Sequence, residues 1–243
     1  MKKILVPSLI ALAVSSLASV AQAQTAPEST LSFNAGLVSD YRYRGISQSR
    51  LNPALQGGVD YADKSGFYVG AWGSTIQWIK DAGGDANVEL DLYGGYKGAV
   101  GDVAYDVGFL RYEYPGNKLA VSANTNEVYG AVTYGLFTAK YSHAVSNLFG
   151  FGDSKNSYYL DLSAALDLGD GYSLTPHVGR QSVKNNAAYS YNDYALTLGK
   201  DLGNGLSATA ALIGTDADQA LYFTPAGKFT GKTGVVLGLK YSF

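Results

Sequence analysis

Apolar and polar residues alternate one by one through several segments of this chain. In residues 235–243, VVLGLKYSF, the odd-numbered positions carry Val, Leu, Leu, Tyr and Phe, and the even-numbered positions carry Val, Gly, Lys and Ser. Similar alternation occurs in residues 31–43, 87–97 and 157–168. A period of two is that of a β-strand, whose successive side chains point to opposite faces. Each segment is about ten residues long, the length that a tilted membrane strand needs.

Weaker strand signals fill the intervals and bring the expected number of strands to twelve. These strands are expected at 54–62, 67–76, 103–114, 125–134, 137–145, 172–180, 191–200 and 206–214, with a last strand at 233–243. Short turns rich in Gly, Asp and Asn, which suit tight hairpins, alternate with longer polar connections. The short turns are expected at 63–66, 98–102, 134–136, 169–171 and 201–205. The long connections are expected at 44–53, 77–86, 115–124, 146–156, 181–190 and 215–232.

This alternation predicts an all-β fold, a transmembrane antiparallel up-and-down β-barrel of about twelve strands. Such barrels have short periplasmic turns and longer extracellular loops. A soluble β-sandwich also has many short strands, but nothing in it requires the connections to alternate in length. Unpaired backbone groups are costly in hydrocarbon, so we expect the last strand to pair with the first, 31–43.

The first residues and the composition agree with export. The chain has 243 residues and no cysteine, and it opens with two lysines, an apolar stretch and the triplet Ala-Gln-Ala. This pattern is typical of a cleaved secretory signal peptide. We therefore expect residues 1–23 to be the signal peptide, 24–30 a short periplasmic leader and 31–243 the barrel. The 18 basic and 20 acidic residues nearly balance, which argues against a nucleic-acid partner.

A motif of about forty residues begins at the end of the first expected strand. It reads Tyr-x-x-Arg-Gly-x-Ser-Gln, then Pro-Ala-x-Gln-Gly, then Ser-Gly-Phe-Tyr, at Tyr41, Arg44, Gly45, Ser47, Gln48, Pro53, Ala54, Gln56, Gly57, Ser65, Gly66, Phe67 and Tyr68. With these residues the chain resembles the TorF-type porin family of proteobacteria, although Thr75 stands where that family commonly has Asn. The resemblance implies a porin-like barrel in the outer membrane of a Gram-negative bacterium, in contact with membrane lipid and lipopolysaccharide.

The C-terminal strand resembles the signal read by the machinery that assembles outer-membrane barrels. That signal is an alternating apolar run that ends in Phe and has Tyr two residues earlier. The matching residues here are Val235, Leu237, Leu239, Tyr241 and Phe243. We also expect Phe243 to be an outward anchor at the periplasmic interface, where aromatic rings are favoured.

The polar parity of the strands predicts which side chains line the interior. The candidates are Asp40, Arg42, Arg44, Glu89, Asp91, Asp106, Glu127, Lys140, Asp161, Asp167, His177 and Asp193. Carboxylates outnumber bases in this set, so a water-filled lumen would mildly favour cations. The expected function is passive passage of small hydrophilic solutes, without a cofactor. These charges could instead pair across the interior and plug it, because a twelve-stranded barrel lies between filled barrels and open channels in size.

Asp40, Arg42 and Arg44 are expected at the extracellular end of the first strand, with Tyr41 and Tyr43 between them. They could form a constriction at the mouth that selects solutes by charge. They could also be a salt-bridge cluster that holds the first loop, with the two tyrosines in the outer aromatic girdle. The second interpretation is the favoured one.

A few charged or polar side chains fall on the outward parity. Arg111, Arg180 and Lys200 lie near predicted strand ends, where a long side chain can reach water. His143 also falls on the outward parity and fits less well there, so we expect a bulge or an error in the assigned register near 137–145.

Two other classes of function remain open. A lipid-modifying enzyme would need a nucleophile and a base on the lipid-facing side. The chain has only His143 and His177 as candidate bases and no Gly-x-Ser-x-Gly elbow, which disfavours an enzyme. The sequence also has no cysteine or histidine cluster for a metal. A structural or adhesive barrel is the other class, although loops of about ten to eighteen residues are modest for adhesion.

Overall fold

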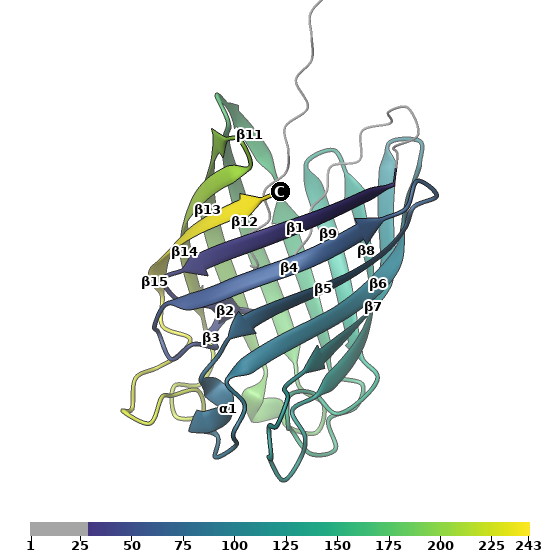
Figure 1. Ribbon diagram of the computed structural model, residues 1–243. Helices are drawn as coiled ribbons and strands as arrows, with labels where there is room; N and C mark the ends of the chain where they lie inside the picture. The colour runs from purple at the N-terminus through teal and green to yellow at the C-terminus, as the bar shows by residue number, and fades with distance from the viewer. Residues whose placement is uncertain (1–28) are drawn as a thin grey trace, which may run out of the picture.

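The computed structural model describes residues 29–243, whose strands curl into one barrel (Figure 1). The wall consists of β1 (Thr30–Val38), β4 (Ala54–Ala62), β5 (Phe67–Thr75), β6 (Val88–Val100), β7 (Val103–Glu113), β8 (Thr125–Tyr134), β9 (Phe137–Ala144), β10 (Tyr158–Ala164), β11 (Leu166–Gly169), β12 (Tyr172–Ser182), β13 (Tyr191–Gly203), β14 (Leu206–Thr215) and β15 (Gly234–Ser242). The loops contain β2 (Arg42–Tyr43), β3 (Ile46–Ser47), α1 (Trp78–Asp81) and the 3-10 turn η1 (Ala187–Tyr189). The expected signal peptide, and the leader up to residue 28, lie outside the described residues.

The barrel is closed and has twelve strands, as predicted. Every strand is antiparallel to its neighbours, and β1 pairs with both β4 and β15. Leu37 of β1 lies opposite Leu239 of β15, so the first and last strands close the sheet. The segments β10 and β11 act as one strand, because both pair with β12 around a single break at Ala165. Closure leaves no sheet edge in the membrane, where unpaired backbone groups would be costly.

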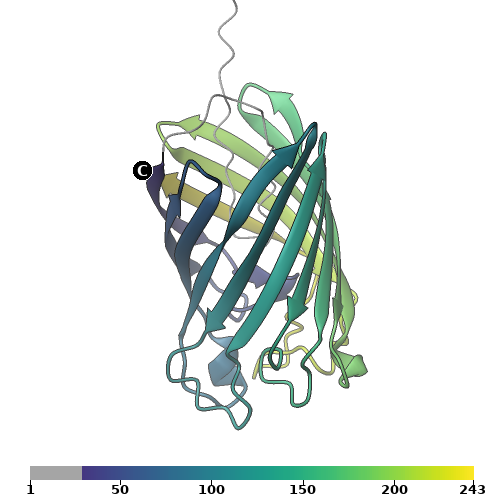
Figure 2. The same ribbon diagram turned by 90° about the vertical axis from the view of Figure 1, so that its right-hand side faces the viewer.

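The short and long connections lie at opposite ends of the barrel, as predicted. Figures 1 and 2 show tilted strands, with the tight turns and the C-terminus at one end and the long loops with α1 at the other. Two of the tight turns are Asp170-Gly171 and Asn204-Gly205, and all four residues have positive φ. Gly, Asn and Asp tolerate this backbone conformation, which two-residue hairpins require. The sequence therefore specifies these turns directly.

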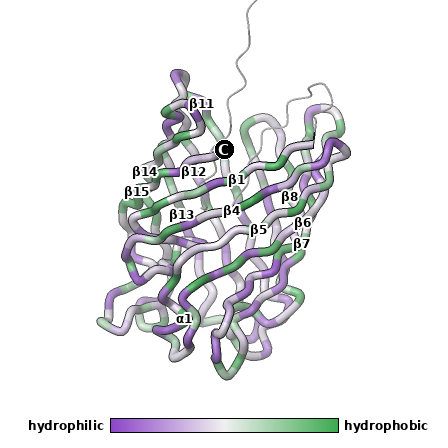
Figure 3. The backbone as a smooth tube through the Cα atoms, viewed as in Figure 1, coloured by the Kyte–Doolittle hydropathy of each residue, from purple (hydrophilic) through white to green (hydrophobic). Residues whose placement is uncertain are grey.

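The outer surface of the strands is apolar. On β15 the exposed fraction is 66% for Val235 and 56% for Leu237, but only 6% for Val236 between them. Figure 3 shows hydrophobic positions spread along the strands. Exposed apolar surface of this extent marks contact with lipid or another apolar partner. Within residues 29–243, the structure contains no helix that is long and apolar enough to cross a membrane.

The C-terminal aromatic residues form a stack at the turn end of the barrel. The ring of Phe243 lies 5.8 Å from that of Phe33 and 5.5 Å from that of Tyr241. The backbone of Phe243 also exchanges hydrogen bonds with Phe33 at 2.8 and 3.0 Å. The last residue therefore continues the pairing of β15 with β1.

The expectation that the first strand extends from 31 to 43 is wrong. The strand β1 ends at Val38, and the chain then turns into the barrel, where Asp40 accepts hydrogen bonds from Ser47 and Ser49 at 2.5 and 3.1 Å. These bonds give the chain an alternative to continued pairing with the neighbouring strands. Tyr41 is buried and Tyr43 half-buried inside the mouth, so they do not belong to the outer aromatic girdle.

The expected bulge near 137–145 is also absent from the described wall. The pairing of β8 with β9 runs without a shift, and His143 lies opposite Val128 on the outward face. Its ring reaches the loop above, with Nε2 3.2 Å from Oδ1 of Asn156. His143 is tolerated on this face because it lies at the end of its strand. Arg111, Arg180 and Lys200 also lie outward near strand ends, as predicted.

Candidate functional site: a hairpin inside the barrel mouth

The first long loop folds into the extracellular end of the lumen as a small hairpin. We call residues 40–49 the luminal hairpin; all of them are buried except the half-buried Tyr43. The strands β2 and β3 are joined by the two-residue turn Arg44-Gly45, whose φ angles are 46° and 79°. A Cβ at Gly45 would lie 2.4 Å from Cγ2 of Thr215 and 2.8 Å from Cβ of Asp193. Gly45 is therefore needed both for the turn and for its close approach to the wall.

Asp40 and Arg42 hold the hairpin in place. Asp40 binds Ser47, Ser49 and the guanidinium of Arg42. Arg42 Nη1 also donates to the carbonyl oxygens of Gly45 and Thr230, both at 2.9 Å. Since Thr230 belongs to the last long loop, the hairpin is joined to a segment almost two hundred residues away. This arrangement agrees with the structural interpretation of the Asp40 and Arg42 pair.

Arg44 connects the hairpin to the opposite wall of the barrel. Its Nη2 donates to Oε2 of Glu127 on β8 at 2.8 Å, and its Nη1 donates to Oε1 of Gln181 on β12 at 2.6 Å. The guanidinium carbon also lies 4.3 Å from the ring centre of Tyr159 on β10. In the wall, β8 and β12 are separated by β9 and β10 and lie across from β1 and β4, where the hairpin begins. Arg44 therefore bridges the mouth.

The charge of Arg44 is permanent in this setting. Burial alone would lower the pKa of Arg44, but the carboxylate of Glu127 outweighs it and holds that pKa well above its usual value. The Arg44 side chain is only 3% exposed, as is expected for a buried charge that has a partner. The contact is therefore insensitive to the protonation of Arg44 at any ordinary pH.

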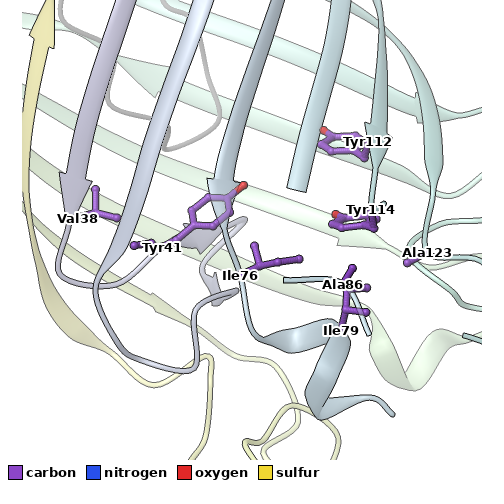
Figure 4. Close-up of a cluster of buried hydrophobic side chains, with 9 residues drawn as sticks. Val38, Tyr41, Ile76, Ile79, Ala86, Tyr112, Tyr114 and Ala123 are labelled. Carbon is purple, nitrogen blue, oxygen red and sulfur yellow. The ribbon is translucent and has the colours of Figure 1, made fainter. Parts of the chain in front are cut away.

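Aromatic and aliphatic side chains fill one flank of the hairpin (Figure 4). The hydroxyl of Tyr41 donates to Oε1 of Glu89 on β6 at 2.5 Å, and the Tyr43 and Tyr112 hydroxyls are 2.5 Å apart. Burial, followed by the nearby Glu89, raises the pKa of Tyr41 well above its usual value. Ile76 beneath the hairpin is fully buried. This flank of the mouth is thus packed against the wall.

The other flank is packed by a separate cluster. Ile46 is buried with Tyr191 of β13 and Ala217 of the last loop, and Tyr222 and Phe229 pack against them. The luminal hairpin is therefore held at its base, at its tip and on both flanks.

Below the hairpin, one wall carries a histidine between two carboxylates. His177 Nε2 lies 2.8 Å from Oδ1 of Asp193, and its Nδ1 lies 3.3 Å from Oδ1 of Asp161. The hydroxyl of Tyr159 donates to Asp193 at 3.0 Å. Asp161 is 1% exposed, and neither of its carboxylate oxygens has a hydrogen-bond partner among the described residues. Lys140 lies opposite Asp161 on the neighbouring strand, with its ammonium over the ring of Tyr129 at 4.2 Å.

The facing wall is acidic and aromatic. Tyr93 donates to Asp60 at 2.5 Å, and Tyr68 donates to Asp106 at 2.6 Å. Asp91 lies on the same face, and its Oδ1 has no hydrogen-bond partner within residues 29–243. Carboxylates on this wall are therefore only partly neutralised by their neighbours.

Comparison with known proteins identifies the family of the chain. A model of the family described as "Bacterial protein of unknown function (Gcw_chp)" matches residues 22–243. The chain belongs to the Gcw_chp family. No curated protein sequence matches this Gcw_chp chain.

The Gcw_chp chain is similar in structure to outer-membrane porins. It matches KdgM porin with a TM-score of 0.55 and 9% identity, and NanC porin with a TM-score of 0.55 and 11% identity. Each match covers 88% of the Gcw_chp chain and 99% of the porin chain. At these identities the similarity establishes the fold, which is that of outer-membrane porins.

Most of the predicted interior residues of the Gcw_chp barrel come together around the hairpin. Those on the wall are Glu89, Asp91, Glu127, Lys140, Asp161, His177 and Asp193, and those on the hairpin are Asp40, Arg42 and Arg44. Asp106 lies farther from the hairpin, in the periplasmic half of β7, where it accepts a hydrogen bond from Tyr68 at 2.6 Å. Asp167 is apart from them: it is exposed beside the tight turn at the other end, where it accepts the N–H of Gly169 at 2.9 Å. Their role in lining a pore stays a prediction.

Sequence reasoning missed two wall residues that contact Arg44. Tyr159 shares the parity of Asp161, so its place on the inward face was readable from the alternation of β10. Gln181 falls in a predicted loop because the sequence predicts a strand that ends at residue 180, whereas β12 extends to Ser182. The last two residues of this strand lacked a distinctive pattern.

Toward the periplasmic end, the interior side chains of the wall from β8 to β14 of the Gcw_chp barrel become small, whereas the opposite wall keeps Tyr68 and Asp106 there. The small side chains include Thr133, Thr138, Ser163, Thr175, Thr197 and Ser207. Small side chains on an inward face leave more of the barrel's cross-section free than the tyrosines near the mouth. Along this wall the barrel is therefore more densely filled near its mouth than at its periplasmic end.

Proposed function

We propose that this Gcw_chp barrel is an outer-membrane channel for the passive passage of small hydrophilic solutes, with a mild preference for cations. The observation that carries the proposal is a closed barrel whose outside is apolar and whose inside holds charged side chains. The resemblance of residues 39–74 to the TorF-type porin family supports the same function.

The luminal hairpin is the constriction of this channel. Arg44 at the tip of the hairpin is neutralised by Glu127, so the tip itself adds little net charge. Asp91 has a carboxylate oxygen without a hydrogen-bond partner among the described residues, and the carboxylate of Asp161 lies 3.3 Å from His177; both carboxylates favour cations in a polar pore. KdgM porin has been solved in complex with disordered oligogalacturonate. That ligand is a polyanion, whereas the lumen of the Gcw_chp barrel is acidic. We therefore expect small neutral and cationic solutes to pass through this barrel better than such a polyanion.

A plugged or structural barrel is the second candidate. The observation that favours it is the packing of the luminal hairpin on both flanks. A barrel held shut in this way would conduct only after the hairpin moves. Conductance separates the two candidates.

An enzymatic function is disfavoured by the positions of the two histidines. His177 lies inside the barrel, away from lipid substrates, and the outward His143 contacts Tyr141 and Asn156. The similar structures, KdgM and NanC, are porins. Acyl chemistry on lipids requires a nucleophile paired with a base on the lipid-facing side.

We further propose how the chain reaches its membrane. Residues 1–23 direct export and are removed, and the barrel assembly machinery recognises the last strand through Val235, Leu237, Leu239, Tyr241 and Phe243. Four of these side chains are exposed on the outer face of β15, and Phe243 follows directly after it, where a second protein could read them.

In planar bilayers the purified barrel is expected to show discrete current steps and a reversal potential that reports cation preference. Asp91→Asn combined with Asp161→Asn should shift the cation-to-anion permeability ratio toward one, because both carboxylates face the lumen. Asp167→Asn is the matched control, since Asp167 lies at the periplasmic turn. Anion preference in the unaltered protein, or an equal effect of the control, would contradict the proposed selectivity, and absence of current would favour the plugged barrel.

A further inference from the structure

Two outward arginines near the extracellular rim have almost the same surroundings but differ in charge balance. Arg111 of β7 donates to Oδ1 of Asn126 at 3.1 Å, and Arg180 of β12 donates to Oδ1 of Asn192 at 3.3 Å. Arg111 also forms an ion pair with Glu113, with Nε 2.8 Å from Oε2. Arg180 has no ion pair among the residues that the structure describes. Its charge therefore faces the membrane boundary unbalanced.

The loops above Arg180 add two more unbalanced cations. Lys155 and Lys184 are exposed on two loops that touch, since the N–H of Lys184 donates to Oγ of Ser157 at 2.9 Å. Neither lysine has an ion-pair partner within residues 29–243. On another part of the rim, by contrast, Lys118 binds Asp85 at 2.7 Å. We call Lys155, Arg180 and Lys184 the basic rim patch.

Two carboxylates on the surrounding loops are engaged by amides. Asp153 accepts a hydrogen bond from Asn185 at 2.9 Å. Asp216 accepts hydrogen bonds from the backbone and the side chain of Asn192, both at 2.6 Å. Asp153 and Asp216 reduce the local positive charge without forming an ion pair with any of the three cations.

An apolar and aromatic surface lies beside Arg180 of the patch. Leu160 is the strand neighbour of Arg180 and of Tyr141, and Tyr158 lies two residues nearer to the loops. The rings of Tyr141 and Tyr158 are stacked with centres 5.7 Å apart, and both side chains are exposed. Cations beside exposed aromatic and aliphatic side chains near the extracellular ends of membrane strands occupy the depth at which a lipid presents its phosphate to a barrel.

We propose that the basic rim patch binds the phosphate of lipopolysaccharide, whose acyl chains cover Leu160 and Tyr158. Two observations select this occupant: the charge of the patch is complementary to a phosphate, and the patch continues into the lipid-facing surface. Arginine suits this role because its guanidinium can form two parallel hydrogen bonds with phosphate oxygens. The inference depends on the barrel's place in the outer membrane and is independent of conductance.

Binding of lipid A to the full barrel in detergent, measured by native mass spectrometry, tests the proposal. Arg180→Gln combined with Lys184→Gln should weaken binding of diphosphorylated lipid A by at least about tenfold, since each cation near a charged lipid surface contributes about a fivefold factor. Arg111→Gln is the matched control and should leave binding unchanged, because Arg111 is already neutralised by Glu113. Slower gel migration after heating verifies that each variant is folded.

Three results would overturn the proposal. The first is an equal loss of lipid A with Arg111→Gln and with the double variant. The second is equally tight binding of lipid A from which the phosphates have been removed. The third is displacement of lipid A by millimolar inorganic phosphate, which would make the patch a site for soluble anions. If the barrel does not conduct but the double variant still binds lipid A more weakly than the unaltered protein, the proposed channel function fails and this proposal stands.

Discussion

Replacing residues 39–53 by a two-residue Asn-Gly turn is expected to raise the single-channel conductance severalfold. The replacement removes the luminal hairpin, which is the densest part of the barrel mouth. Val38 and Ala54 lie directly opposite each other in the pairing of β1 with β4, so a tight turn can join them without moving either strand. The polar wall behind the hairpin then faces water. The measurement is the current step in planar bilayers at fixed salt and voltage.

The same variant distinguishes a constriction from an inert loop. The shortened barrel must first show heat-dependent gel migration, which verifies that it is folded. A conductance equal to that of the unaltered protein would contradict the role of the hairpin as the constriction. If the unaltered barrel does not conduct and the shortened barrel does, the hairpin is a plug.

Glu127→Ala is expected to lower the free energy of unfolding by about 3 kcal/mol, because it leaves the buried charge of Arg44 without its carboxylate. The tip of the hairpin should also become mobile, and the current through the channel should become noisier. Urea unfolding of the barrel in lipid vesicles measures the first effect, and single-channel recording measures the second.

Two further variants sharpen this prediction. Arg50→Ala breaks a different loop ion pair, the one with Asp81, in which the Arg50 side chain is 38% exposed; such exposed pairs contribute about 0–1 kcal/mol. Arg44→Met combined with Glu127→Leu removes both buried charges and should recover most of the lost stability, as apolar replacements of buried pairs often do. Equal losses for Glu127→Ala and Arg50→Ala would contradict the importance of the bridge across the mouth.

The barrel itself could be predicted from local sequence patterns. Alternation with a period of two assigns each strand residue to a face, and pairs such as Asn204-Gly205 mark the turns because few other residues adopt positive φ. Closure then follows from the cost of an open sheet edge in lipid. These arguments use neighbouring residues only, so a single sequence is sufficient for them.

The candidate site could be predicted only in part. In the sequence, the alternation of β1 continues through Tyr41 and Tyr43. Only the contacts of Asp40 with Ser47 and Ser49 show that the chain turns inward. The partners of Arg44 are 83 and 137 residues away, and no local pattern connects them.

Parity also gives the face of a residue without its height in the barrel. Asp161 and Asp167 share the inward parity of one strand, but only Asp161 lies near the hairpin, and Asp167 lies by the periplasmic turn. The interior candidates could therefore be named from the sequence, whereas their grouping required the three-dimensional structure.

Single-cysteine substitution tests most directly the claim that the inward face of a membrane-embedded barrel is wetted by a conducting lumen. The chain has no cysteine, so Thr197→Cys, Leu196→Cys and Leu198→Cys each introduce one thiol into β13. Thr197 points inward, and both leucines are exposed on the outer face. We predict that a charged, membrane-impermeant thiol reagent reacts with Thr197→Cys in a bilayer and lowers its current, while both leucine variants stay unmodified. Modification of the leucine variants with an unreactive Thr197→Cys would contradict the account.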